Sequence, residues 1–248
     1  LITSSMFPNN MGTFTGCVKA IGEQPIIGLV NPSAMAQKTF AEMLFNMVWC
    51  GIDNIRGIRC SANWMWPIPT KDSGEGYKMY HVMKELSALC IKSGIAIDGG
   101  KDSLSMATRV SSGDDGGEEL VKSAGSLVLT GYAKCPDITK RTTPDLKPVS
   151  DSSILFIDLG ENNCNMGGSI ALHVLGKLTD DVPIIHNLEH IIETFNIIQR
   201  LVYANIILAG HDKSDGGLIT CLLEMAIAGN IGINVDIVRM NSEIADIP

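Results

Sequence analysis

Helix signals and strand-like apolar runs alternate along both halves of this 248-residue chain. Residues 31–51, NPSAMAQKTFAEMLFNMVWCG, predict a helix with Asn31 as N-cap, Pro32 at the first helical position and Gly51 beyond its end. The alternation predicts a mixed fold, and no Rossmann fingerprint accompanies it. Further elements in the first half are a strand leading into a loop at 54–64, a helix at 75–94, and strands at 94–100 and 126–133.

Residues 136–151 have the composition of a linker, because they contain three prolines and few apolar side chains. A domain boundary near residue 148 is therefore expected, with units at 1–148 and 149–248. Residues 109–124 carry glycines and acids without periodicity, which predicts an exposed irregular excursion. The second half is expected to contain strands at 153–160, 206–210 and 232–237, a turn at 165–169, helices at 188–203 and 218–229, and a loop at 211–217.

Composition narrows the class of protein. A net charge of -8 without a cluster of basic residues argues against a nucleic-acid partner. Polar residues interrupt the longest apolar run, 197–209, so no membrane span is expected. Seven cysteines without a C-x-x-C pair favour reduced thiols in the cytoplasm. Leu1 is not an initiator methionine and no signal peptide follows it, so we expect the chain to begin inside a longer gene product.

The stretch AIDGGKDSLSMA, residues 96–107, places glycines, a lysine and a serine after an apolar run. It is not a Walker A loop, because Asp102 stands where the magnesium-binding hydroxyl should be. Glycines still allow backbone N–H groups to approach an anion, while Lys101 adds charge and Ser103 a hydroxyl. The residues leave two alternatives open, a phosphate-binding loop and a structural turn.

The stretch GHDKSDGGL, residues 210–218, places Asp212 and Asp215 between a predicted strand and a predicted helix. Ligands gather outside the carboxyl ends of strands, and a helix N-terminus favours phosphate. The structural alternative is that Asp215 or Ser214 caps the helix.

Glu42 and Asn46 lie four residues apart on the first predicted helix and so project from one face. A carboxylate and an amide oxygen are suitable ligands for Mg²⁺. A solvated or capped polar pair is the alternative.

Four segments carry a further signal in collinear order: SANWMW (61–66), DGGKDSLSM (98–106), CPDITKRTTPDLK (135–147) and GHDKSDGGLITCLLEMAIAGN (210–230). They resemble the phosphoribosylformylglycinamidine synthase family in its large single-chain form, specifically its second aminoimidazole-ribonucleotide-synthetase-like half. This family uses ATP and glutamine in purine biosynthesis. The resemblance covers essentially the whole chain and implies an α+β fold. The two domains would resemble the N- and C-terminal domains of aminoimidazole ribonucleotide synthetase, the first contributing strands to a shared barrel.

The same resemblance implies a site for Mg²⁺ and ATP or ADP. A further aspartate of the family site falls before Leu1, and no catalytic residue is assigned. The implied metal ligands are Glu42, Asn46 and Asp212; the implied nucleotide-binding residues are Gly100, Lys101 and Ser214; and Ser103 is the implied substrate contact.

The implied reaction converts formylglycinamide ribonucleotide to formylglycinamidine ribonucleotide. The ATP γ-phosphate activates the formamide oxygen, and ammonia derived from glutamine then displaces phosphate. The ammonia would come from a glutaminase domain elsewhere in the same polypeptide. Within the family, the alternative is that this half holds a structural nucleotide and is non-catalytic.

A different class of function is raised by HNLEH at 186–190, which fits the H-x-x-E-H pattern of zinc peptidases. On one helix face, His186 and His190 would bind zinc and Glu189 would act as general base. An ordinary amphipathic helix with surface histidines is the competing interpretation.

Overall fold

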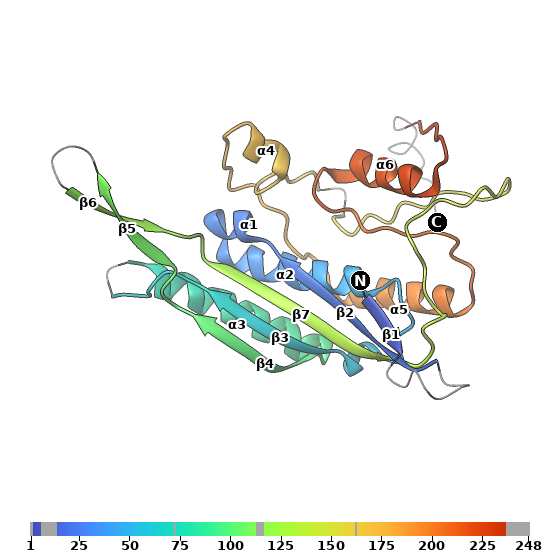
Figure 1. The fold of residues 1–248 in the computed structure, drawn as a ribbon, viewed down its shortest axis with the longest axis horizontal. Coiled ribbons are helices and arrows are strands. Elements are labelled where there is room, and N and C mark those ends of the chain that lie inside the picture. Colours follow the sequence, from blue (N-terminus) through green and yellow to red (C-terminus); the bar gives the residue numbers. More distant parts are fainter. Residues whose placement is uncertain (1, 6–13, 72, 113–116, 162, 237–248) are drawn as a thin grey trace.

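A five-stranded sheet organises the first half of the computed structural model, which describes residues 2–5, 14–71, 73–112, 117–161 and 163–236. Strands β3 and β4 are parallel and the other neighbours are antiparallel. β4 stands at one end of the strand order and so forms one edge of the sheet (Figure 1). The strand order is β1 (Ile2–Ser5), β2 (Gly16–Glu23), β7 (Ser126–Cys135), β3 (Arg59–Met65) and β4 (Ala96–Ser103).

Helices α2 (Pro32–Met47) and α3 (Glu75–Ser93) cover one face of this sheet, and the short α1 (Pro25–Val30) precedes α2. β2 and β7 show the period of two expected of strands with one buried face. The core between helices and sheet is apolar, which fixes the sheet register because a one-residue slip would expose it. Its fully buried members include Val18, Met35, Phe40, Met43, Leu44, Leu127 and Leu129.

Local caps explain the predicted helices, which are confirmed. Asn31 Oδ1 accepts a hydrogen bond from Ala34 N at 3.0 Å, and Pro32 opens α2. Gly94, with a φ of +76°, ends α3 in the left-handed conformation that glycine adopts without strain. The predicted strand at 54–64 begins instead with a 3₁₀ turn at Ile55–Gly57, ahead of β3.

The predicted irregular excursion at 109–124 is exposed but is not irregular. Most of it forms an antiparallel hairpin of β5 (Ala107–Ser112) and β6 (Gly117–Lys122), which projects beyond the main sheet (Figure 1). An ion pair of 3.3 Å between Arg109 and Glu118 crosses the two strands. Periodicity was a poor guide because a hairpin exposed on both faces needs no apolar alternation. Residues 113–116 lie outside the described residues.

The second half contains the predicted helices but not the predicted strands. α5 (Leu188–Tyr203) and α6 (Gly217–Gly229) match the expected positions, and a short α4 (Ile170–Val174) follows the glycine turn. No strand forms in the described residues of 153–160, 206–210 or 232–236, and residue 237 lies outside them. A strand requires a paired neighbouring strand, and these apolar runs pair with none in the described residues.

The predicted linker is anchored on both sides by main-chain hydrogen bonds. Thr142 N donates to Trp49 O at 2.8 Å, and Leu146 N donates to Met225 O at 3.2 Å. Residues 136–151 therefore hold the second half against the first, and α5 also packs against α2 and α3. No described helix is both long and apolar enough to cross a membrane.

Candidate functional site

One face of α2 carries a polar stripe directed at the edge of β2. Lys38, Glu42 and Asn46 follow one another at spacings of four residues, which align them on one face of α2, and Trp49 stands two residues after the end of this helix. Glu42 Oε2 accepts hydrogen bonds from Glu23 N at 2.8 Å and from Gln24 Nε2 at 3.0 Å. The expected proximity of Glu42 and Asn46 on one face is thus present.

The amide of Asn46 also contacts β2, since its Nδ2 donates to Ile21 O at 2.9 Å. This bond uses the nitrogen of the amide and leaves Oδ1 as the atom able to ligate a cation. Glu42 and Asn46 together satisfy backbone groups at the edge of β2 beyond its pairing with β1. The pair therefore has a structural role at this end of β2.

The segment 210–217 packs against Trp49, just beyond the end of this stripe. Trp49 Nε1 donates to Asp212 Oδ1 at 3.4 Å, and a Cβ on Gly210 would lie 2.0 Å from the Trp49 ring. Only glycine allows this approach. His211 connects the segment to α6, because its Nε2 lies 3.1 Å from Glu224 Oε2 and its Nδ1 lies 3.8 Å from Asp212 Oδ1.

Like charges face each other where this segment meets α2. Burial raises the pKa of Glu42, and the negative charge of Asp215 raises it further. Burial lowers the pKa of Lys38, and Lys213 lowers it further, while Glu42 acts in the opposite direction. The structure thus brings the carboxylates of Glu42 and Asp215 together, and likewise the ammonium groups of Lys38 and Lys213. A bound cation would stabilise the carboxylate pair, and a bound anion would stabilise the ammonium pair.

The structural alternative, in which Asp215 or Ser214 caps α6, is wrong. The N-cap of α6 is Gly216, and no side chain accepts a hydrogen bond from the first turn of this helix. Ser214 and Asp215 are exposed, so both remain accessible to a ligand.

The donor chemistry of the predicted metal ligands suits Mg²⁺. Glu42, Asn46 and Asp212 offer only carboxylate and amide oxygens. Within the described residues no group of three or more His, Cys, Asp or Glu side chains is close enough to hold a metal ion. That finding does not conflict with a set of two carboxylates and one amide, because magnesium keeps several waters as ligands.

The GGKDS sequence is the end of a strand, so it is neither the expected loop nor the alternative turn. β4 continues through it to Ser103 in parallel pairing with β3, and seven of its eight residues are exposed. A Cβ on Gly100 would lie 2.1 Å from Ala62 O, so the close approach of the two strands requires this glycine. Lys101 Nζ donates to Ser103 Oγ at 3.0 Å, so the two expected ligand contacts bond each other.

The two groups of predicted site residues lie at different edges of the sheet. Lys101 pairs with Asn63, Asn63 with Val128, and Val128 with Glu23, the residue that contacts Glu42. Three strand spacings separate Lys101 from Glu23, or about 14 Å. A single phosphate group cannot contact both sets.

The peptidase pattern at 186–190 does not form the required helix face. Asn187 is the N-cap of α5, with Oδ1 accepting from His190 N at 3.0 Å, so His186 precedes the helix. His186 Nε2 lies 3.1 Å from Asn163 Nδ2. The two histidines therefore lack the one-turn spacing on a helix that such a zinc site needs.

Comparison with known proteins identifies the family. The FGAR-AT PurM_N-like domain matches residues 2–134, and the AIR synthase related protein C-terminal domain matches residues 165–246. The chain belongs to the phosphoribosylformylglycinamidine synthase family. It is 45% identical over 225 residues to phosphoribosylformylglycinamidine synthase of Dictyostelium discoideum, covering 90% of this chain and 16% of the relative. The human enzyme is 41% identical, with the same coverage of each chain.

The Arabidopsis thaliana relative is named probable phosphoribosylformylglycinamidine synthase, chloroplastic/mitochondrial, and is 46% identical over 90% of this chain and 15% of its own length. The chain therefore spans about one sixth of the curated relatives it matches. These names favour the synthase family over the zinc peptidase.

Solved structures confirm the expected α+β fold. T. maritima PurL complexed with FGAR superposes with a TM-score of 0.61 at 10% identity, covering 92% of this chain and 35% of PurL. Thiamine-monophosphate kinase from Stenotrophomonas maltophilia K279a gives 0.53 at 16% identity, covering 92% and 67%. The boundary at residue 148 stays a prediction.

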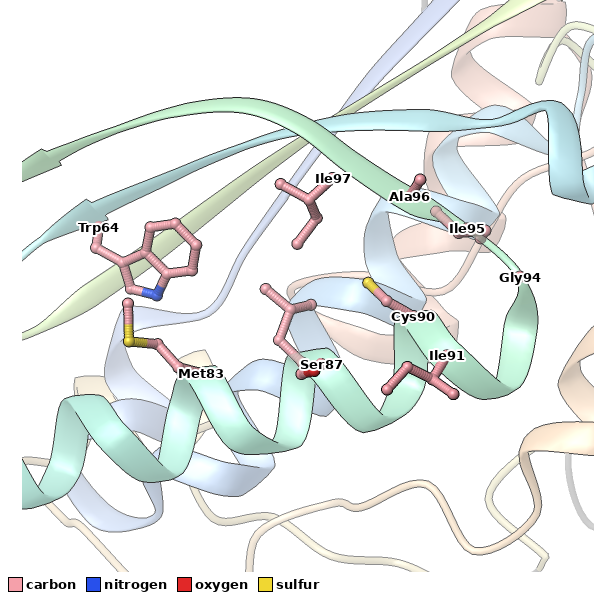
Figure 2. Close-up of a pocket in the computed structure, with 10 residues that line it drawn as sticks. Trp64, Met83, Ser87, Cys90, Ile91, Gly94, Ile95, Ala96 and Ile97 are labelled. Atoms are coloured by element: carbon pink, nitrogen blue, oxygen red, sulfur yellow. The ribbon is translucent and has the colours of Figure 1, made fainter.

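Sequence inspection missed several residues of the site and one pocket. The helical spacing from Glu42 points to Lys38, whereas only the fold brings Lys213 near Lys38 and Asp215 near Glu42. A pocket of about 470 Å³ between α3 and β4 is lined mainly by apolar side chains, with Trp64 at one end and Cys90 on its floor (Figure 2). Burial raises the pKa of the Cys90 thiol to about 11, so the thiol is neutral there.

Proposed function

We propose that the chain is part of the synthetase region of phosphoribosylformylglycinamidine synthase. The whole protein would convert formylglycinamide ribonucleotide to formylglycinamidine ribonucleotide with ATP and glutamine-derived ammonia, in the cytoplasm, with a glutaminase domain in the remaining polypeptide. The observation that carries this proposal is the packing of the segment 210–217 beside the polar stripe of α2. Two carboxylates, Glu42 and Asp215, and two ammonium groups, Lys38 and Lys213, come close to each other there. The reaction itself is assigned from the membership of the chain in the synthase family.

Glu42, Asn46 and Asp212 would hold Mg²⁺ bound to ATP or ADP. When bound, Mg²⁺ would neutralise phosphate charge and relieve the repulsion between Glu42 and Asp215. Glu23 N and Gln24 fix the Glu42 carboxylate, and Trp49 fixes Asp212, so the oxygens are oriented before the ion arrives. Ser214 would contact the nucleotide from the exposed part of the segment.

Gly100, Lys101 and Ser103 would serve a separate ligand at the β4 edge. Structures of T. maritima PurL complexed with FGAR and with ATP support the presence of both ligand classes in this fold. Because about 14 Å separates the two groups, we assign the substrate phosphate to Ser103 and Lys101. Gly100 would contribute only backbone groups to this contact. Its lack of a side chain is explained by the close packing of β4 on Ala62 of β3.

Calorimetry of ADP with and without Mg²⁺ tests the metal assignment. Wild-type protein should bind ADP in a magnesium-dependent manner, and Asp212→Ala should weaken that binding by about 10- to 100-fold. Asp180→Ala, an exposed carboxylate away from α2, is the control. Equal ADP affinity with and without the metal would remove the assignment.

Kinetics of the full-length enzyme test the β4 contact. Ser103→Ala should raise the KM for formylglycinamide ribonucleotide by an amount equivalent to about 1 to 3 kcal/mol, the cost of a lost hydrogen bond to a charged group. The thermal midpoint should barely change, because the Ser103 side chain bonds only exposed Lys101 in the described residues. An unchanged KM with a lowered midpoint would show that Ser103 is structural.

A further inference from the structure

Lys38 is a partly buried lysine without a partner of opposite charge in contact. Its Nζ forms no hydrogen bond and no ion pair within 4.0 Å among the described residues. Glu42, one turn further along the same face, is engaged by Glu23 N and Gln24 Nε2. An ammonium group removed from water without compensation costs free energy, so the position of Lys38 calls for an anion.

The loop that packs on this face brings a second lysine and an open helix terminus. Contacts of Trp49 with Gly210 and Asp212 hold the loop against the chain just beyond the end of α2. Lys213 follows directly, and it lies close enough to Lys38 for its charge to lower the pKa of Lys38. α6 has 13 residues, no acidic residue in its first turn and no side-chain cap. Its first N–H groups therefore lack a side-chain acceptor, and such groups bind phosphate readily.

We propose that Lys38, Lys213 and the first turn of α6 form an anion subsite that contacts a phosphate group of the nucleotide directly. This inference rests on the proposed nucleotide site and extends it, since none of these groups is a metal ligand. The subsite takes a di- or triphosphate rather than an uncharged ligand, because its donors are ammonium and backbone N–H groups.

The surrounding charges make the subsite dependent on the metal. Glu42, Asp212 and Asp215 outnumber the two lysines, which leaves a formal charge of -1 on this group of five side chains. One bound Mg²⁺ would change that charge to +1. Phosphate binding should therefore be strong only when Mg²⁺ is present. Lys38 should contribute to the affinity for phosphate and not to the affinity for Mg²⁺.

Calorimetry with inorganic pyrophosphate in the presence of Mg²⁺ tests the subsite. Lys38→Met should weaken pyrophosphate binding by about 10- to 100-fold, and exposed Lys213→Met by less. Mg²⁺ alone should bind Lys38→Met at least as tightly as wild type, because a like charge has been removed. Lys84→Met, an exposed lysine on α3, is the control.

Thermal unfolding gives a second, independent measurement. Without ligand, Lys38→Met should raise the midpoint, because the uncompensated ammonium is gone; with saturating pyrophosphate, wild type should become the more stable protein. Lys38→Arg should retain pyrophosphate binding. A lowered midpoint for Lys38→Met together with unchanged pyrophosphate affinity would overturn the subsite.

Failure of this inference can be separated from failure of the proposed function. If Lys38→Met binds magnesium ADP and pyrophosphate as wild type does, the subsite is wrong and the metal assignment stands. If wild type binds pyrophosphate through Lys38 but shows no magnesium-dependent ADP binding, the nucleotide assignment is wrong and the anion subsite stands.

Discussion

Trp49 Nε1 donates a hydrogen bond to Asp212 Oδ1 across 163 residues of sequence. The bond joins the end of the α2 stripe to the loop before α6, and the Trp49 ring also packs on Gly210. Trp49 thus positions a proposed metal ligand without being one.

Trp49→Phe should loosen Asp212 while keeping an aromatic ring against Gly210. We expect magnesium-dependent ADP binding to weaken by about 2- to 10-fold and unfolding free energy to fall by about 0.5 to 1.5 kcal/mol, the range for one hydrogen bond. A double-mutant cycle with Asp212→Ala, read by calorimetry, measures the coupling. Strictly additive effects would show that the indole does not act through Asp212.

Glu42→Gln should make stability depend less on pH. Because burial raises the pKa of Glu42 in the folded protein, its favourable contribution is fully present below the ordinary value of 4.5 and is lost as pH rises through the folded pKa. Glutamine keeps an oxygen for Glu23 N and carries no charge. At pH 7 the variant should therefore be more stable than wild type without metal.

That advantage should vanish at about pH 4, where wild-type Glu42 is protonated. Urea unfolding at both pH values is the measurement, with the exposed Glu193→Gln on α5 as control. A variant less stable than wild type at pH 7 would contradict the assigned desolvation of Glu42.

Gly100→Ala and Gly99→Ala test whether GGKDS is held as a strand. A Cβ at position 100 would lie 2.1 Å from Ala62 O, whereas one at position 99 would lie 3.9 Å from Ser61 Oγ. Gly100→Ala should cost about 1 to 3 kcal/mol of unfolding free energy, because β4 must shift away from β3. Gly99→Ala should cost less than about 1 kcal/mol. Equal costs in urea titrations would mean that β4 does not press on β3.

Gln199→Met should detach α5 from the end of α2. The buried amide accepts from Ile52 N at 2.8 Å and donates to Val48 O at 2.6 Å and Cys50 O at 3.0 Å. Loss of three buried hydrogen bonds should cost about 2 to 5 kcal/mol, measured by urea unfolding. Asn196→Met, exposed on the same helix, should change stability little. Similar costs for both variants would contradict a special role for the buried amide.

Local sequence determined the helices of this protein and part of its site. Asn31 and Asn187 cap α2 and α5 through contacts three residues away, and Gly94 ends α3, so these boundaries follow from neighbouring residues. The spacing of Glu42 and Asn46 places them on one face for the same reason. The motifs between 61 and 230 predicted the family that the comparisons then identified.

Tertiary structure decided what depends on distant partners. GGKDS became a strand because β3 lies beside it, and its glycine serves contact with Ala62; no neighbour in sequence carries that information. The apolar runs of the second half form no strands in the described residues, because strand formation requires a paired edge and not only an apolar pattern. Lys213 and Asp215 come close to Lys38 and Glu42 only because the chain folds back to Trp49. The effect of their charges on the site therefore depends on contacts that local sequence cannot specify.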